Sequence, residues 1–484
     1  MSADLDPLLT RYLAGDIDAA EMARLNALLA ADADARRRFA EELNLDSTLA
    51  RHALEWRAEE CAPPRSEAAP RWRPGRAAAR AVAAVAAGLA LAAWIFGEPD
   101  FARVEKAAGI PQLAPGARLR GERHAFAGGT LALVTVRGAS VVIEAPAEFQ
   151  FESAQRLRLT RGRLSAVVPP AAKGFTVVTP SGVAVDLGTR FGVDVPAAGD
   201  AEVHVFEGEV IAQAARDRRN LRTGDAVAMT TGGHYARDVR AAAFIQSDEV
   251  GDLTAGLAAG QRARAEATLA RLREDPDLIA LLDFEEGGES GEFRTVQGRW
   301  PGSRAPEFTR IGDHAKLDLG GNRTWPRLTL AAWVRLDRLD APYQSLLHTD
   351  GWTASNPGQV HWMVNRFSTM RLALRGNTLA AGSPEPDSFP DSRTPVLPEI
   401  GRWVHLAVVY DSIARTTRFF LNGRFDNESR EAIAHPARFG PSRIGNWDRV
   451  DRKLSGRVDE MVILGRAMTD TEVESLFAAG NPYH

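Results

Sequence analysis

The spacing of apolar residues changes character along the chain and predicts three kinds of segment. Near the N-terminus these residues recur at helical spacing: Leu8, Leu9, Tyr12 and Leu13, then, after Gly15, Met22, Leu25, Leu28 and Leu29. Residues 81–97, AVAAVAAGLALAAWIFG, form one uncharged run. Beyond residue 130, short alternating runs predict strands with one buried face. The pattern therefore predicts a multidomain chain: a small all-α N-terminal bundle, one transmembrane helix and two all-β domains.

The run at 81–97 predicts a helix that crosses a membrane. As a helix it would be about 25 Å long, at the short end of what a bilayer core requires. Four arginines precede it and two acidic residues follow it: Arg71, Arg73, Arg76 and Arg80, then Glu98 and Asp100. The positive-inside rule then places residues 1–76 in the cytoplasm and the residues after about 98 in the periplasm, as in a single-pass inner-membrane protein. The alternative is an alanine-rich helix buried in a soluble protein.

The segments on either side of this run differ in pattern. Residues 1–60 predict three short helices with a marginal core, which a partner would stabilise; the alternative is a self-sufficient bundle that only anchors the chain. Residues 61–80 are a Pro- and Arg-rich linker. Residues 104–239 predict a β-roll or β-helix-like sandwich, residues 240–277 a linker helix, and residues 278–484 a second β-sandwich.

Composition and charge limit the number of domains and exclude some classes of function. The chain has 484 residues, of which 45% are hydrophobic and 25% charged, so most of it should fold, into about three domains. A net charge of -4 gives no electrostatic footprint for nucleic acid. The single cysteine, Cys61, is incompatible with an internal disulfide framework or a Cys-rich zinc site. We expect no metal and no cofactor.

Three spaced blocks of the first β region resemble a known family. FTVVTPSGVAVDLGTRFGVDV, AEVHVFEGEV and NLRTGDAVAM are similar to the FecR domain of transmembrane sigma-factor regulators, over about Val104–Val239. The resemblance implies that the N-terminal segment binds an extracytoplasmic-function sigma factor in the cytoplasm and that the external part receives a signal. The chain lacks the zinc ligands of some members, so its sigma-binding segment would be metal-free. Candidate sigma-binding residues are Leu9, Tyr12, Leu13, Leu25, Leu28, Leu29 and Phe39.

Gly188 and Thr189 raise the question of self-cleavage. Certain members of this family cut themselves at a Gly-Thr bond, when the Thr hydroxyl attacks the preceding carbonyl. The period-two pattern of Val183–Val195 predicts one strand, with Asp186 on the opposite face from Thr189 and poorly placed as a base; His204 is the other candidate base. The alternative, which we favour, is that Thr189 only builds the sheet.

The C-terminal region resembles a LamG or concanavalin A-like jelly roll, over about Leu278–Phe477. Its blocks are LIALLDFEE, LTLAAWVRLD, GRWVHLAVVYD, TRFFLNGR with an Asn422-Gly423 hairpin turn, and LSGRVDEMVILGRAMTDTEVESLF. A retaining glycosidase needs a carboxylate pair on one strand face, whereas Asp459 and Glu460 are adjacent. We therefore expect no enzyme. Ligand-binding candidates lie in loop-like stretches: Trp352, Trp362, Asn365, Arg366, Asn446, Trp447 and Asp448.

The sequence thus predicts a FecR-type, anti-sigma-like membrane regulator. Its expected partners are a sigma factor inside, an envelope glycan or protein outside, and the membrane itself. The alternative is a non-catalytic, membrane-anchored surface protein for adhesion or structure that binds carbohydrate or protein.

Overall fold

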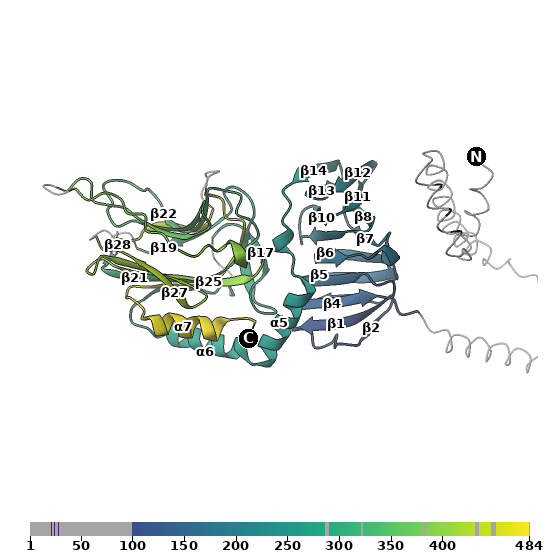
Figure 1. The fold of residues 1–484 in the computed structure, drawn as a ribbon, viewed down its shortest axis with the longest axis horizontal. Helices are drawn as coiled ribbons and strands as arrows, with labels where there is room; N and C mark the ends of the chain where they lie inside the picture. The colour runs from purple at the N-terminus through teal and green to yellow at the C-terminus, as the bar shows by residue number, and fades with distance from the viewer. Residues whose placement is uncertain are drawn as a thin grey trace, which may run out of the picture. The chain divides into compact units, whose positions relative to one another are not determined.

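The computed structural model describes residues 99–483, apart from 286–289, 321–322, 381–383, 431–434 and 447–451, together with Glu21, Arg24 and Leu28 (Figure 1). Residues 96–484 form one compact unit, separate from residues 1–95. Glu21, Arg24 and Leu28 are helical. The predicted three-helix bundle otherwise lies outside the described residues, as does the run at 81–97. No helix among the described residues is long and apolar enough to span a bilayer.

The first β domain (residues 99–237) is built from fourteen strands of one sheet. They are β1 (Ala102–Ala108), β2 (Arg118–Leu119), β3 (Arg123–Phe126), β4 (Thr130–Thr135), β5 (Ser140–Ser153), β6 (Arg156–Val167), β7 (Thr176–Thr179), β8 (Gly182–Asp186), β9 (Arg190–Val195), β10 (Ala201–Glu207), β11 (Glu209–Ala214), β12 (Asp217–Arg222), β13 (Ala226–Thr230) and β14 (Gly233–Arg237).

The sheet divides at β6 and encloses its own core. The first half of β6 pairs with β7, which continues to β8, β11 and β12, and its second half pairs with β9, which continues to β10, β13 and β14. Alternate side chains from both branches enter one apolar cluster, among them Ala184, Val210, Val203 and Met229. This is the roll-like arrangement that dense short strands predict.

Two strands of this sheet are longer than the short apolar runs of the sequence suggest. The apolar runs 140–143 and 149–151 belong to one strand, β5, and the runs 157–159 and 164–168 fall within or next to β6. Register shifts between Glu144 and Phe149 let the β5–β6 ladder bend instead of ending. Polar residues at the bend look like a loop in the sequence, although the backbone stays paired.

The strand predicted for Val183–Val195 is wrong in one respect. It breaks into β8 and β9, which belong to different branches of the sheet, and the chain turns at Leu187–Thr189. Gly188 has φ +101°, a conformation that residues with a side chain rarely adopt. The alternation continues across the corner, so the sequence pattern hides the turn.

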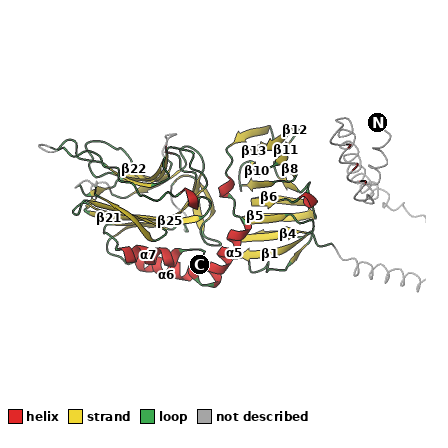
Figure 2. Ribbon diagram, in the orientation of Figure 1, coloured by secondary structure: helices red, strands yellow, loops and turns green. Residues whose placement is uncertain are grey.

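Two helices connect this domain to the next: α5 (Ser247–Ala258) and α6 (Gln261–Arg273). A short 3₁₀ turn, Ala241–Ala243, precedes them. Helix α5 packs on β1, β4 and β5, while α6 lies beside the C-terminal helix α7 (Asp470–Gly480), as Figure 2 shows.

The C-terminal sandwich (residues 278–483) has two antiparallel sheets. The larger contains β15 (Leu278–Leu282), β17 (Arg294–Gln297), β18 (Arg304–Phe308), β21 (Arg327–Leu336), β25 (Trp403–Asp411), β26 (Thr416–Leu421), β27 (Arg424–Ser429) and β30 (Gly456–Leu464). The smaller contains β16 (Gly291–Glu292), β19 (His314–Asp318), β22 (Tyr343–Thr349), β23 (Val360–Asn365), β24 (Met370–Leu374) and β29 (Pro441–Gly445), and β20 (Thr324–Trp325) pairs with β28 (Ala437–Arg438).

The sandwich buries one core between its sheets and a second under α7. The first includes Leu330, Val364, Leu372 and Ile463. The second lies on the outer face of the larger sheet, where α7 contributes Val473 and Leu476. A capping box, in which Thr469 and Glu472 bond each other's backbone N–H, begins α7.

Candidate functional site

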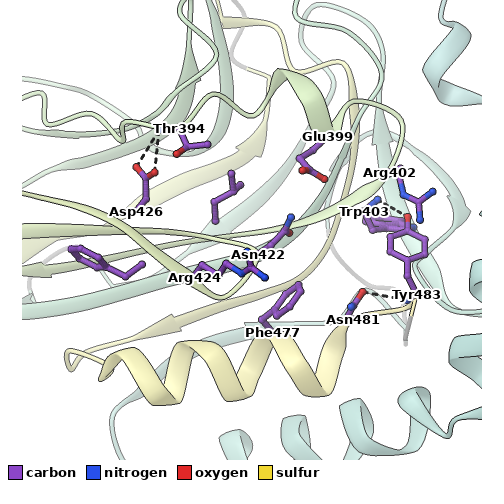
Figure 3. A pocket seen from close by; sticks show the side chains of 12 residues that line it. Thr394, Glu399, Arg402, Trp403, Asn422, Arg424, Asp426, Phe477, Asn481 and Tyr483 are labelled. Atoms are coloured by element: carbon purple, nitrogen blue, oxygen red, sulfur yellow. Dashed lines mark hydrogen bonds between the residues drawn. The ribbon is translucent and has the colours of Figure 1, made fainter.

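A cavity of about 550 Å³ opens beside the β26–β27 hairpin, α7 and the C-terminal segment (Figure 3). Its lining residues come from four segments of the sandwich: Thr394, Glu399, Arg402, Trp403, Leu421, Asn422, Arg424, Phe425, Asp426, Phe477, Asn481 and Tyr483. We call this the hairpin pocket.

The hairpin itself has the geometry that its sequence predicts. Asn422 and Gly423 have φ +49° and +72°, as a two-residue turn with both central residues in the left-handed region requires. A Cβ on Gly423 would lie 2.6 Å from the Cβ of Phe477, so α7 packs directly on the turn. Asn422 Oδ1 accepts a 3.0 Å hydrogen bond from the His405 N–H.

The pocket combines an aromatic surface with two unpaired charges. The Phe425 side chain is 50% exposed, and Phe477 contributes a second ring from α7. The Glu399 carboxylate and the Arg424 guanidinium have no hydrogen-bonding or ionic partner among the described residues. An exposed ring, an acid and a guanidinium can stack on and hydrogen-bond a polyhydroxylated ligand.

The remaining polar groups of the pocket stiffen its walls. Asp426 accepts hydrogen bonds from the Arg393 and Thr394 N–H groups, at 2.5 and 3.1 Å. The Tyr483 hydroxyl accepts from the Trp403 N–H at 2.8 Å and donates to Glu249 at 2.9 Å. Burial raises the pKa of that hydroxyl well above its usual value, so Tyr483 stays protonated and keeps donating.

The opposite wall is tied to helix α5. Arg402 stacks on the Tyr483 ring, 4.2 Å from its centroid, and pairs with Asp252 of α5 at 2.6 Å. Glu249 of α5 also pairs with Arg335 at 2.5 Å. The pocket is therefore anchored outside the sandwich as well as within it.

The turn between β8 and β9 holds the predicted Gly188–Thr189 bond. The Thr189 hydroxyl donates to Asp186, and the Gly188 N–H donates to the other oxygen of the same carboxylate at 2.7 Å. Asp186 is fully buried and Thr189 is 4% exposed. Burial raises the pKa of Asp186, with the Thr189 hydrogen bond opposing it.

Comparison with family models assigns both β regions. Residues 125–211 match the FecR protein family, and residues 311–474 match the concanavalin A-like lectin/glucanases superfamily. The chain carries a FecR domain followed by a concanavalin A-like domain. The first β domain is called the FecR domain below, and the sandwich keeps its name. None of the curated proteins matches the chain.

Solved structures are similar to part of the chain at low identity. Domain 4 of AbnA, an extracellular arabinanase from Geobacillus stearothermophilus solved with arabinotriose, is 16% identical with a TM-score of 0.30, over 41% of this chain and 86% of that one. The botulinum neurotoxin serotype G binding domain is 10% identical (TM-score 0.33; 41% and 50% covered). The binding domain of Paraclostridial Mosquitocidal Protein 1 is 15% identical (TM-score 0.33; 43% and 52% covered). The chain spans about half the length of the last two.

Three of the predicted ligand-binding residues are buried in the structure. Trp362 is fully buried in the sandwich core, because β23 directs it between the sheets. Asn365 is 3% exposed and accepts from the Phe367 and Thr369 N–H groups of its own turn. Asn446 is fully buried and bonds the Arg310 carbonyl and the Leu454 N–H. Trp362 therefore packs in the core, and the two asparagines stabilise loops through hydrogen bonds to the backbone.

Trp352 and Arg366 do not line the hairpin pocket. Trp352 is half-buried, with its ring 4.2 Å from the His361 ring, and Arg366 is exposed over Phe367. Trp447 and Asp448 lie outside the described residues. Leu28 is half-buried, and the other sigma-binding candidates are not described.

The structure also places three titratable residues that, from the sequence alone, are possible catalytic groups. Asp186 was expected to be poorly placed as a base, which is wrong: the turn at Gly188 brings its carboxylate onto Thr189. His204 lies opposite Gly192, three positions beyond Thr189, and its ring packs on Phe244. Asp459 is buried and accepts from the Arg299 N–H at 2.8 Å, and burial raises its pKa to about 8.

The hairpin pocket was missed because its residues are scattered from 394 to 483. One sequence signal was available: the Asn422-Gly423 turn is followed directly by Arg424, Phe425 and Asp426, which a two-residue hairpin places next to its turn. The contribution of the C-terminal Tyr483 depends on tertiary packing and leaves no local pattern.

Proposed function

We propose that the protein is a single-pass signalling regulator of the FecR type. Residues 1–76 hold an extracytoplasmic-function sigma factor in the cytoplasm, residues 81–97 cross the inner membrane, and the two β domains bind an envelope ligand in the periplasm. The FecR domain and the order of the domains support this proposal. The arginines before residue 81 and the acids after residue 97 support the orientation.

We propose further that the sandwich binds a carbohydrate in the hairpin pocket. The observation that carries this is an exposed Phe425 ring in a pocket of the concanavalin A-like domain that Glu399 and Arg424 also line, neither of which has a partner among the described residues. Sugar rings stack on aromatic faces, and charged side chains accept from or donate to their hydroxyls. Because the lining contains two acids and two arginines, a neutral saccharide fits better than a highly charged one.

Binding can be tested with the purified full-length chain. It is screened against an array of neutral and acidic oligosaccharides, and hits are titrated by intrinsic tryptophan fluorescence, since Trp403 lines the pocket. Phe425→Ala should weaken binding about five- to tenfold, the loss expected for one aromatic contact. The control Phe367→Ala removes another exposed ring and should not change the affinity. No oligosaccharide binding, or equal effects of the two variants, would reject the site.

The regulator and the anchored adhesion protein differ in what the N-terminal segment binds. In a pull-down with the full chain in detergent, the regulator captures a sigma factor of the extracytoplasmic-function class. Leu28→Asp should abolish this capture, whereas Arg24→Ala, at an exposed helical position, should preserve it. Failure to capture any sigma factor favours the surface-protein alternative.

We assign the Gly188–Thr189 turn a structural role. Asp186 satisfies both the buried Thr189 hydroxyl and the Gly188 N–H, which would otherwise be unpaired in the turn. The purified chain should therefore have one mass, that of the intact polypeptide. A fragment that begins at Thr189 and disappears in Thr189→Ala would reverse the assignment and make Asp186 the base.

A further inference from the structure

One face of the FecR domain carries apolar side chains that lie outside the domain's own core. Ala108, Ala132 and Val142 point away from the enclosed cluster of the roll. They pack with residues from helix α5 and its approach and from the sandwich: Ile245, Val250, Leu253, Ala305, Trp333, Trp403 and Tyr483. The two β domains therefore share one apolar cluster, with α5 between them.

The turns at the edge of this cluster meet at backbone distance. A Cβ on Gly128 would lie 2.3 Å from the Gly302 Cα, and a Cβ on Gly109 would lie 2.2 Å from the Pro301 Cβ. The Gly129 N–H donates to the Gln297 side chain at 2.5 Å. Such close approach requires the two turns to fit each other in one arrangement.

Beside the apolar cluster lies a network of five arginines and five carboxylates. Arg294 bonds Asp194 twice, at 2.7 and 2.8 Å, and Arg163 bonds Asp194 at 2.9 Å and Glu307 at 2.8 Å. Arg457 pairs with Glu144 at 2.5 Å, Arg335 with Glu249 at 2.5 Å, and Arg240 with Asp337 at 3.2 Å. Except for Arg294, every one of these side chains is less than a tenth exposed.

The network is complete only when both domains are present. Glu144, Arg163 and Asp194 belong to the FecR domain, Arg240 and Glu249 to the connection, and the other five residues to the sandwich. Three of these six pairs join residues of the two domains directly: Arg294 with Asp194, Arg163 with Glu307, and Arg457 with Glu144. Burial alone would raise the pKa of Asp194, but the charge of Arg163 holds it well below its usual range. A contact between the domains in another orientation would bury some of these charges without partners.

We propose that the FecR domain and the sandwich form a single rigid sensing body, joined by a surface of the FecR domain whose specific partner is the sandwich of the same chain. The apolar cluster holds the two domains together. The ion pairs fix their orientation, because any other orientation would bury charged side chains without partners. Lys106 of β1 also donates to the Ser247 carbonyl at the start of α5, at 2.9 Å. A displacement of the sandwich therefore moves β1, the first strand after residues 81–97, without a hinge.

The distance between the domains can be measured by double electron–electron resonance on the full chain in detergent. In a Cys61→Ser background, spin labels are placed at Val136→Cys in the FecR domain and at Ile413→Cys in the sandwich, which are 63% and 68% exposed. The parent pair should give one narrow distance distribution. Labels at Val136→Cys and Tyr235→Cys, both in the FecR domain, serve as the control pair.

Two variants disrupt the surface in different ways. Gly128→Leu forces a side chain against Gly302 at a partly exposed turn that neither domain core uses, and Glu307→Ala removes a shared carboxylate. Both should broaden or shift the interdomain distribution and leave the control pair unchanged. A broad distribution in the parent, or an unchanged one in Gly128→Leu with its control pair intact, would overturn the proposal. Neither result depends on whether the hairpin pocket binds a sugar.

Discussion

Arg294 and Asp194 are joined by two hydrogen bonds, 2.7 and 2.8 Å long, although 100 residues separate them in the chain. Asp194 belongs to β9 of the FecR domain and Arg294 to β17 of the sandwich. The same carboxylate, which is 1% exposed, also accepts from Arg163 at 2.9 Å. One buried acid thus receives guanidinium groups from both domains.

Removal of this acid should destabilise the outer domains strongly. Asp194→Ala leaves Arg163 buried without one of its two carboxylates, and the loss of one member of a buried pair costs about 3–5 kcal/mol. The free energy of unfolding is measured with urea. Glu266→Ala, which breaks an exposed pair with Arg262 on α6, is the control and should cost about 0.5 kcal/mol or less. Equal effects of the two substitutions would contradict the described network.

Buried histidines should make the sandwich sensitive to acid. Burial lowers the pKa of His361 to about 4, and burial together with the neighbouring His361 lowers the pKa of His348 to about 2, from 6.5. The unfolded chain then binds more protons than the folded one below pH 6.5. The free energy of unfolding therefore keeps its full value above pH 6.5. It falls as the pH drops towards 4, by about 1.4 kcal/mol per pH unit for His361 alone.

Urea unfolding at a series of pH values tests this dependence. His361→Gln should flatten the slope between pH 6.5 and 4, whereas Met363→Leu, on the same strand, removes no titratable group and should preserve it. A slope that is identical in both variants would show that His361 is not held neutral.

The hairpin turn should not tolerate a side chain at Gly423. Its φ of +72° is unfavourable for other residues, and the new Cβ would collide with Phe477. Gly423→Ala should therefore cost more than about 1 kcal/mol of stability and weaken any ligand that binds the hairpin pocket. Thermal unfolding and titration measure the two effects. The control Gly116→Ala shares the positive φ but has open space around it, so it should lose less stability and leave ligand affinity unchanged.

Local patterns in the sequence predict much of the fold. Both β domains follow from alternating apolar residues, and the Asn422-Gly423 hairpin follows from two residues whose conformational preferences leave few alternatives. The turn at Gly188 cannot be predicted in this way, because β8 and β9 keep the same alternation while the chain changes from one branch of the sheet to the other.

The candidate site is less accessible to sequence reasoning. Trp362 and Asn446 occupy polar, loop-like contexts, yet tertiary packing buries both. Glu399, Phe425 and Tyr483 come together only when α7 and the C-terminal segment pack on the larger sheet. The buried arginines at the domain interface are equally inconspicuous, since Arg163 and Arg457 lie in strands whose neighbours suggest ordinary exposed charges.

The side of the membrane on which each region lies is the central claim, and the single cysteine allows a direct measurement. Cells with a permeabilised outer membrane are treated with a membrane-impermeant maleimide, before and after the inner membrane is opened. We predict that Cys61 in the native chain reacts only after opening, whereas Val136→Cys in a Cys61→Ser background reacts in both conditions. Equal reactivity of the two cysteines before opening would place both ends of the 81–97 run in one compartment and contradict the signalling scheme.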